Sequence, residues 1–142
     1  MSRVRDIVQQ RQLFSVEEDQ SVAEVARRMA DLNVGAILVL RQGELRGVFS
    51  ERDLMTRVVL GSLDPSATPV SKVMTTNLAT VDESATLEEA MEKMRSCNCR
   101  HLPVKQESQV VGFLSMRDLM NFELARKTEE LHHMRAYIHG NA

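Results

Sequence analysis

The sequence of 142 residues is poor in several residue types, and each scarcity excludes something. It has no Trp, one Tyr and four Phe, so its core must be mainly aliphatic, with nine Met as flexible fillers. Its two Cys are separated by a single residue, which rules out an ordinary disulfide framework. Gly and Pro are few, and 43% of the residues are hydrophobic. This balance predicts a globular fold rather than a disordered chain.

Long apolar runs and a strong net charge are also missing. No stretch reaches the roughly 20 apolar residues of a transmembrane helix, and MSRVRDIVQQRQ at the start lacks the apolar core of a signal peptide. We therefore expect a soluble, cytoplasmic protein with no membrane partner. The formal net charge of −2 gives no general attraction to polyanions. Together with the scarce aromatics, it disfavours nucleic acid as a partner.

The few Cys and His residues offer little for a metal. Cys97, Cys99 and His101 could form a three-ligand site, but no second Cys or His pair stands nearby at zinc spacing. We expect buried or half-buried thiols at a helix end instead. His132 and His133 are expected at the surface, so no metal site is predicted.

An internal repeat dominates the chain. GVFSERDLM at 47–55 returns as GFLSMRDLM at 112–120, 65 residues later, and 13–55 aligns with 78–120 without a gap. Upstream, VRDIV at 4–8 pairs with VSKVM at 70–74, one residue out of step. A repeat of this kind decides the architecture. Each copy of about 60 residues is at the lower limit for a core of its own, so the copies should pack on each other.

Each copy has the pattern of strand, helix, strand, strand, helix. Ser21 with Glu24, and Thr86 with Glu89, form the pattern of capping boxes at the first helices, which carry apolar stripes at helical spacing. Predicted hairpin strands follow at 36–40 and 45–49, and again at 102–104 and 110–114. Ser50 and Ser115 should open the second helices.

We thus predict an α/β fold of two β-α-β-β-α repeats and a C-terminal helix. The expected units are residues 1–60, a linker at 61–69, residues 70–124 and a helical tail at 125–142 that stops near Gly140. The tail should pack back on the body or pair with a second subunit.

The repeated segment Gly-h-h-Ser-x-Arg-Asp, where h is hydrophobic, holds the main candidate site residues. These are Ser50, Arg52 and Asp53 in the first copy, and Ser115, Arg117 and Asp118 in the second. A helix start suits a phosphate, Arg adds positive charge where it opposes the helix dipole, and Asp could accept both hydroxyls of a ribose. The alternative is that Ser and Asp form only a capping pair. The residues alone leave both interpretations open.

A second candidate is RHLPV at 100–104. Arg100 and His101 begin a short apolar strand, and Pro103 lacks an amide, which favours an edge or cleft strand that could face an anion. The alternative is a solvated Arg100 and a His101 that only packs. No nucleophile or paired carboxylate accompanies His101 at a catalytic spacing, and no known catalytic motif is present. We therefore expect no enzyme activity.

These motifs resemble the cystathionine-β-synthase (CBS) domain, in the tandem arrangement called a Bateman module. The resemblance rests on VRDIV, VSKVM with the following Thr75, both Gly-h-h-Ser-x-Arg-Asp-Leu-Met segments and RHLPV, and it covers Val4 to Leu124. It implies a pseudo-twofold sandwich of two repeats with two potential adenosine sites in a cleft. It also implies a ligand sensor rather than a catalyst, assembled as a homodimer.

The resemblance assigns roles to the candidate residues. Asp53 and Ser50 would hold ribose in one site, and Asp118 and Ser115 in the other. Phe14 and Ala79 would line the base pockets, while Arg100 and His101 would face phosphates of the nucleotide held by the other repeat. The Asp53 site would then receive these two basic residues, whereas the Asp118 site would face Gly35 and Ala36. We therefore expect tighter binding of phosphorylated ligands at the Asp53 site.

The function expected from this resemblance is a regulatory module that binds ligands of the AMP, ADP or ATP class and signals to a partner protein. An adenine nucleotide would be its regulatory ligand, and no cofactor is obligatory. The alternative is a ligand-free interaction or scaffold module whose Ser-x-x-Asp elements serve only as caps. A sensor of S-adenosylmethionine or NAD(H) is less favoured, because the arginines suit a ligand that carries phosphate.

Overall fold

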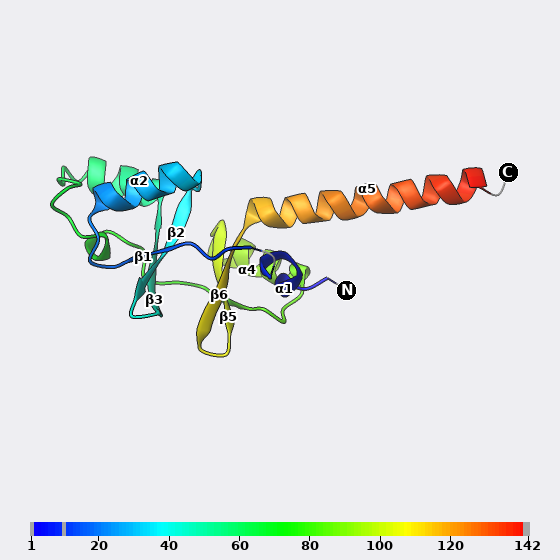
Figure 1. Cartoon of the computed structure of the whole chain (residues 1–142), viewed down its shortest axis with the longest axis horizontal. Helices are drawn as coiled ribbons and strands as arrows, with labels where there is room; N and C mark the ends of the chain where they lie inside the picture. The colour runs from blue at the N-terminus through cyan, green and yellow to red at the C-terminus, as the bar shows by residue number, and fades with distance from the viewer. Residues whose placement is uncertain (1, 10, 141–142) are drawn as a thin grey trace.

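Two three-stranded sheets, one from each copy, form the centre of the structure, a computed structural model that describes residues 2–9 and 11–140 (Figure 1). The first sheet holds β1 (Ser15–Glu17), β2 (Ala36–Arg41) and β3 (Glu44–Ser50), and the second β4 (Val81–Asp82), β5 (His101–Gln106) and β6 (Gln109–Ser115). In both, the first strand pairs in parallel with the second, and the second pairs antiparallel with the third. The predicted α/β fold with two repeats is confirmed.

The crossover helices α2 (Val22–Leu32) and α4 (Leu87–Cys97) begin and end alike. The Ser21 hydroxyl accepts from the amide of Glu24 at 3.2 Å, and the Thr86 hydroxyl accepts from Glu89 at 3.1 Å. Each helix ends at an Asn in the left-handed conformation, Asn33 or Asn98. Asn tolerates this conformation better than most residues, so the same side chain ends both helices.

The second helices differ between the copies. In the first copy, α3 (Glu51–Asp53) runs into a π-helical segment, η1 (Leu54–Val59). In the second copy a single helix, α5 (Met116–Gly140), continues for 25 residues. The predicted tail is therefore not a separate element. From Lys127 to His139 every side chain is exposed, so this part of the helix does not pack back on the body.

The leading segment of each copy packs on the core of the other copy. Val4 and Val8 in α1 (Val4–Val8) belong to the core around Leu102 of the second copy. Val70 in η2 (Val70–Lys72) belongs to the core around Phe49 of the first copy. The sequence pattern did not predict this exchange, which ties each repeat to its neighbour.

A third apolar cluster joins the two sheets. Ala36, Leu38 and Val48 of the first copy are buried together with partly buried residues of the second, Leu78, Val110 and Phe113. The two copies therefore bury apolar surface against each other, as two units of this size need.

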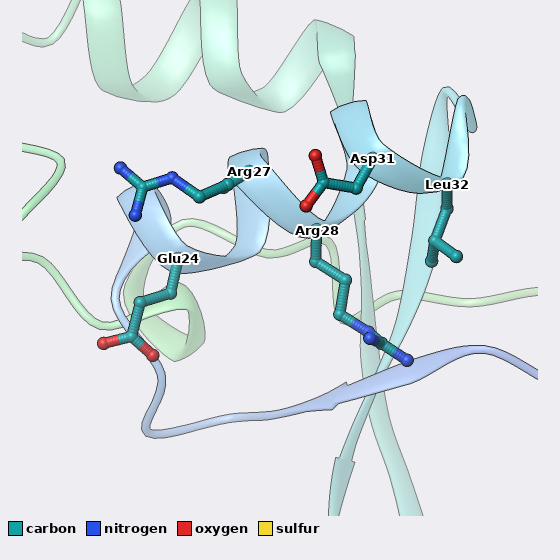
Figure 2. Close-up of a pocket in the computed structure, with 5 residues that line it drawn as sticks. All are labelled: Glu24, Arg27, Arg28, Asp31 and Leu32. Carbon is teal, nitrogen blue, oxygen red and sulfur yellow. The ribbon is translucent and has the colours of Figure 1, made fainter.

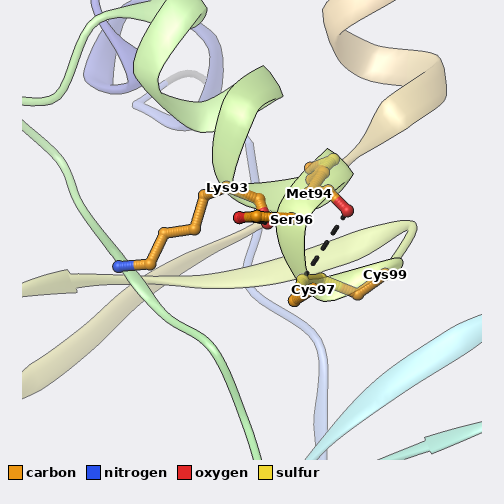
Figure 3. The surroundings of a disulfide bond; sticks show 5 residues. All are labelled: Lys93, Met94, Ser96, Cys97 and Cys99. Carbon is orange, nitrogen blue, oxygen red and sulfur yellow. Dashed lines mark hydrogen bonds between the residues drawn. A yellow bond between two sulfur atoms is a disulfide. The ribbon is translucent and has the colours of Figure 1, made fainter.

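The cysteines differ from the prediction of free thiols. Cys97 and Cys99 are joined by a disulfide across the turn at Asn98, where α4 ends (Figure 3). Cys97 is exposed, whereas Cys99 is half-buried as expected. A bond between cysteines so close in sequence is not part of a larger disulfide framework, but the left-handed residue between them, Asn98, accompanies a Cα separation of 5.4 Å, which suits a disulfide.

Within the described residues, no helix combines the length and the apolar character needed to cross a membrane.

Candidate functional site

The Asp53 carboxylate lies at the start of α3 and closes a complete capping box. Its Oδ2 accepts hydrogen bonds from the Ser50 amide at 3.1 Å and the Ser50 hydroxyl at 3.0 Å. In return, the Ser50 hydroxyl accepts from the Asp53 amide at 3.1 Å. Asp53 is only 7% exposed, which is unusual for a carboxylate. Capping uses one carboxylate oxygen and leaves the other for different partners.

The second oxygen of Asp53 faces groups from the other repeat and from η1. The Thr75 hydroxyl donates to this carboxylate, at 3.1 Å from Oδ1 and 3.3 Å from Oδ2, and Arg57 Nε lies 3.6 Å from Oδ1. Arg57 also donates to the backbone carbonyl of Met74 at 2.9 Å. Arg57 thus ties η1 to the segment that carries Thr75. The site around Asp53 is built from both repeats.

Gly47 explains how Thr75 comes so close. The backbone of Thr75 pairs with Val48 in β3, with hydrogen bonds of 2.8 and 2.9 Å. A Cβ at Gly47 would lie 2.7 Å from the Met74 sulfur and 2.8 Å from the Thr75 carbonyl oxygen. Only glycine leaves room for this segment to cross the strand. The Gly of the repeated motif is therefore needed because the other copy's leading segment passes there.

The second copy has the same cap but a different partner. The Ser115 amide donates to Asp118 Oδ2 at 2.8 Å, and the Asp118 amide donates to the Ser115 hydroxyl at 3.0 Å. Arg11 then holds both carboxylate oxygens, with Nη2 at 2.8 Å from Oδ1 and Nη1 at 2.8 Å from Oδ2. Such two-point pairing is the strongest form of this contact.

The pKa shifts of Asp118 and Arg11 agree with an ion pair between them. Burial raises the pKa of Asp118, but hydrogen bonds from Arg11 and Ser115 outweigh it, so the net pKa lies below the ordinary value. The hydrogen bond with Asp118 raises the pKa of Arg11. Both groups therefore stay charged at neutral pH, and Arg11 engages both oxygens of the Asp118 carboxylate.

The motif glycine of the second copy also lies where the leading segment of the other copy crosses. A Cβ at Gly112 in β6 would lie 2.7 Å from the Cβ of Val8 in α1. The segment that follows α1 delivers Arg11 to Asp118, as the segment that follows η2 delivers Thr75 to Asp53. The two sites are thus related by the repeat, but a cation stands in one where a hydroxyl stands in the other.

His101 lies between the two sites. Its ring stacks on Phe113, with centroids 5.2 Å apart, and Phe113 belongs to the cluster between the sheets. Burial lowers the pKa of His101; the carboxylates of Asp118 and Glu51 act in the opposite direction, and Arg100 adds to the lowering. Glu51 comes from the first copy, two residues before Asp53. His101 is therefore in electrostatic reach of both copies, and it is neutral at pH 7.

The remaining predicted site residues take less distinctive positions. Arg52, Arg100 and Arg117 are exposed at the ends of the strands and helices that carry the sites. Phe14 packs against the first copy's core and Ala79 against the second's, as their equivalent positions in the repeat require. Pro103 is buried in β5 opposite Phe113. Because β5 is the middle strand of its sheet, the edge strand that Pro103 favoured is not observed.

Sequence reasoning missed Arg11, Arg57 and Glu51 as site residues, and it noted Thr75 only as part of a motif. Their contacts follow from the exchange of leading segments, for which the sequence pattern carries no local signal. Within the described residues, no group of three or more His, Cys, Asp or Glu side chains could hold a metal.

Two shallow hollows lie away from these residues. One, of about 260 Å³, is lined by Glu24, Arg27, Arg28, Asp31 and Leu32, which Figure 2 shows projecting from successive turns of α2 alone. The other, of about 430 Å³, lies between the tips of the two hairpins and includes Glu44 and Lys105. Neither brings a buried polar group together with residues of the repeated motif.

Comparison with known families agrees with the repeat. The sequence profile of the CBS domain matches residues 4–60 and 70–125. CBS domain-containing protein YhcV of Bacillus subtilis is 36% identical over 119 residues, which cover 84% of each chain. The mitochondrial CBS domain-containing protein CBSX3 of Arabidopsis thaliana is 31% identical over 127 residues. That match covers 86% of this chain but only 62% of the plant protein.

Solved structures share the fold. A CBS-domain containing protein from Agrobacterium tumefaciens, ATU1752, superposes with a TM-score of 0.79 at 28% identity, over 86% of this chain and 99% of the other. The CBS domain pair of protein MJ0100, solved with 5′-methylthioadenosine and S-adenosyl-L-methionine, also gives 0.79, at 20% identity. That match covers 89% of this chain and 98% of the other, and it supports the fold alone.

Proposed function

Because this chain belongs to the CBS-domain family and carries two copies of the domain, we propose that it is a regulatory module that binds an adenosine-containing ligand at Asp53. The observation that carries the proposal is the environment of that carboxylate. It is buried at a helix start, and it meets a hydroxyl from the other repeat rather than a two-point cation. A ribose diol can replace the hydroxyl of Thr75 at lower cost than it can replace Arg11 at Asp118.

The ligand class follows from the groups around Asp53. A vicinal diol suits the carboxylate oxygen that faces Thr75, and Phe14 at the start of the same sheet offers a wall for a base. Arg52 in the first turn of α3 and Arg100 of the other repeat would favour a ligand that carries phosphate, to which the neutral ring of the neighbouring His101 could add a hydrogen bond. AMP, ADP or ATP fits these groups best. The ligands of the MJ0100 domain pair share the adenosyl part but carry no phosphate.

Regulation requires that the ligand bind two states of the protein with different affinity. The Asp53 site takes Thr75 from the second copy, so a ligand there would act on the contact between copies. We infer that a partner protein responds to that change, and that the module itself has no catalytic role. The exposed Met55 and Val59, and the equivalent Met120 and Leu124, favour a homodimer as the assembled form.

The proposal is tested by titrating the protein with AMP, ADP, ATP, S-adenosylmethionine and NADH in a calorimeter. We expect at least one adenine nucleotide to bind, and Asp53→Asn to weaken its binding by about tenfold to a hundredfold, since charge-assisted hydrogen bonds contribute about 1.5–3 kcal/mol each. Asp118→Asn is the matched control, and it should leave the affinity near that of the wild type.

A second candidate function is a ligand-free interaction module. It is favoured by one observation: in both Ser-x-x-Asp elements the Ser and Asp residues satisfy each other in complete capping boxes. A ligand that binds only the folded state raises the melting temperature. Under this alternative, therefore, no nucleotide would raise it. Asp53→Asn and Asp118→Asn would then lower stability by similar amounts of about 1 kcal/mol, as lost caps do.

A further inference from the structure

The outer part of α5 is a long helix that is exposed along its length. The CBS profile ends at residue 125, and every side chain from Lys127 to His139 is exposed. Figure 1 shows this part of α5 running away from the body. Isolated helices of about 12–15 residues are only marginally stable in water. A second chain is therefore the natural source of stability for this segment.

The exposed apolar residues of α5 follow a heptad repeat. Taking Leu124, Leu131 and Ile138 as a positions, seven residues apart, places Met120 and Met134 at d positions. All five side chains are between 51% and 66% exposed, although each is large and apolar. Spacing of alternately four and three residues is what two supercoiled helices bury between them. One stripe thus runs along the helix from the body to near its end.

Lys127 interrupts the stripe at the d position between Leu124 and Leu131. A single polar residue in such a seam fixes the register of pairing at some cost in stability. The aliphatic stem of Lys127 can still cover apolar surface while its ammonium group reaches water. One lysine therefore selects how the helices align without removing the stripe.

The charges beside the stripe favour pairing of two copies in the same direction. Glu130 stands at a g position and Arg135 at the e position of the next heptad, five residues later. In a parallel pair, g of one helix faces this e of the other, so Glu130 would meet Arg135 twice, once on each side. In an antiparallel pair, g positions face g positions, which brings Glu123 and Glu130 of the two chains together. Charge complementarity therefore selects the parallel arrangement.

We propose that α5 pairs with α5 of a second copy as a short parallel two-stranded coiled coil. The seam covers less than three heptads and is too short to hold two chains alone. It continues, however, into Met120 and Leu124 on the body, whose repeat equivalents Met55 and Val59 are also exposed. Contacts between the bodies would raise the effective concentration of the two helices. This inference does not depend on nucleotide binding.

Disulfide trapping tests the pairing in the full chain. In a Cys97→Ser/Cys99→Ser background, Leu131→Cys places a thiol at an a position, where parallel helices bring equivalent residues together. His132→Cys, at the neighbouring b position, is the matched control on the outer face. We expect Leu131→Cys to form covalent dimers at least about tenfold faster under mild oxidation. Equal rates for the two variants would overturn the proposal.

Sedimentation velocity of variants that carry charged residues in the apolar stripe measures how far self-association depends on it. Leu131→Glu/Met134→Glu should weaken self-association by about tenfold or more, whereas Ala136→Glu on the outer face should leave it unchanged. Glu130→Arg should also weaken association, and adding Arg135→Glu should restore it. A chain whose association none of these variants alters, or whose α5 pairs only with a different protein, would contradict the proposal.

Discussion

At the scale of single residues, the motif glycines Gly47 and Gly112 lie where the leading segment of one copy crosses the other copy. Gly47→Ala would press a methyl group against the carbonyl oxygen of Thr75, at 2.8 Å, which is itself held by the Val48 amide. Because neither backbone can yield cheaply, we expect a loss of about 1–3 kcal/mol in the free energy of unfolding, as overpacking costs. Denaturation in urea measures it. Gly47→Ala should also weaken nucleotide binding, since Thr75 would be displaced from Asp53.

Gly35→Ala is the control for this substitution. Its Cβ would lie 3.6 Å from the flexible carboxylate of Glu51, an ordinary contact. Alanine lowers the conformational entropy of the unfolded chain relative to glycine, so this variant should be as stable as the wild type or slightly more stable. Equal effects at Gly35 and Gly47 would show that the crossing does not depend on the motif glycine.

The lowered pKa of His101 predicts that the stability of the fold depends on pH. Burial lowers its pKa below the usual 6.5, so between the two values the unfolded chain binds more protons than the folded one. Stability therefore rises with pH through this window, is complete above about pH 6.5 and is lost on acidification. Calorimetric melting between pH 7.5 and 5.5 should show a decrease that is smaller in His101→Gln. The slope due to this residue cannot exceed about 1.4 kcal/mol per pH unit. An identical slope in His101→Gln would contradict the argument.

Sequence reasoning reached the residues that carry the caps but not their partners. Ser50, Asp53, Ser115 and Asp118 follow from a local pattern, because a capping box is complete within four residues. Thr75 and Arg11 reach the same carboxylates from 22 and 107 residues away. No periodicity encodes such a contact. Their identity decides how the two sites differ, and only the folded chain reveals it.

At the scale of elements, the strands, hairpins and crossover helices were predictable because their patterns are local. The exchange of α1 and η2 between copies was not, since an apolar stripe shows that a segment is buried but not where. The junction of the second helix and the tail was also missed. Residues 120–126 contain no Gly or Pro to end a helix, so one helix continues.

Arg57 joins η1 to the segment after η2, so we expect its removal to lower both stability and nucleotide binding. It donates to the Met74 carbonyl from η1 and thereby holds the segment after η2 against the first copy. We expect Arg57→Ala to cost about 1–2 kcal/mol in the free energy of unfolding, as for a hydrogen bond from a charged group. It should also weaken nucleotide binding at Asp53. Arg27→Ala, an exposed arginine on α2, should change neither quantity in the same denaturation and titration experiments.

At the scale of the whole molecule, the repeat makes two sites that are built alike but filled differently. Each copy supplies a capped carboxylate, and each leading segment delivers one side chain to the other copy's carboxylate. Thr75 leaves Asp53 with an exchangeable partner, while Arg11 closes Asp118 from both oxygens. Under the proposed function, such a doubled fold would hold one ligand-binding site and one closed site.

This asymmetry predicts the number of ligands per chain. If Arg11 occupies the ribose position, the wild type should bind one nucleotide per chain, at Asp53. Arg11→Ala should open Asp118 and raise the stoichiometry to two in calorimetric titration. Because Arg11 is 45% exposed, losing the pair should cost only about 1 kcal/mol or less, so the variant should still fold. Adding Asp118→Asn should return the stoichiometry to one. If Arg11→Ala still binds a single nucleotide, Arg11 is not what closes the second site, and the difference between the copies must come from Arg100 and His101 instead.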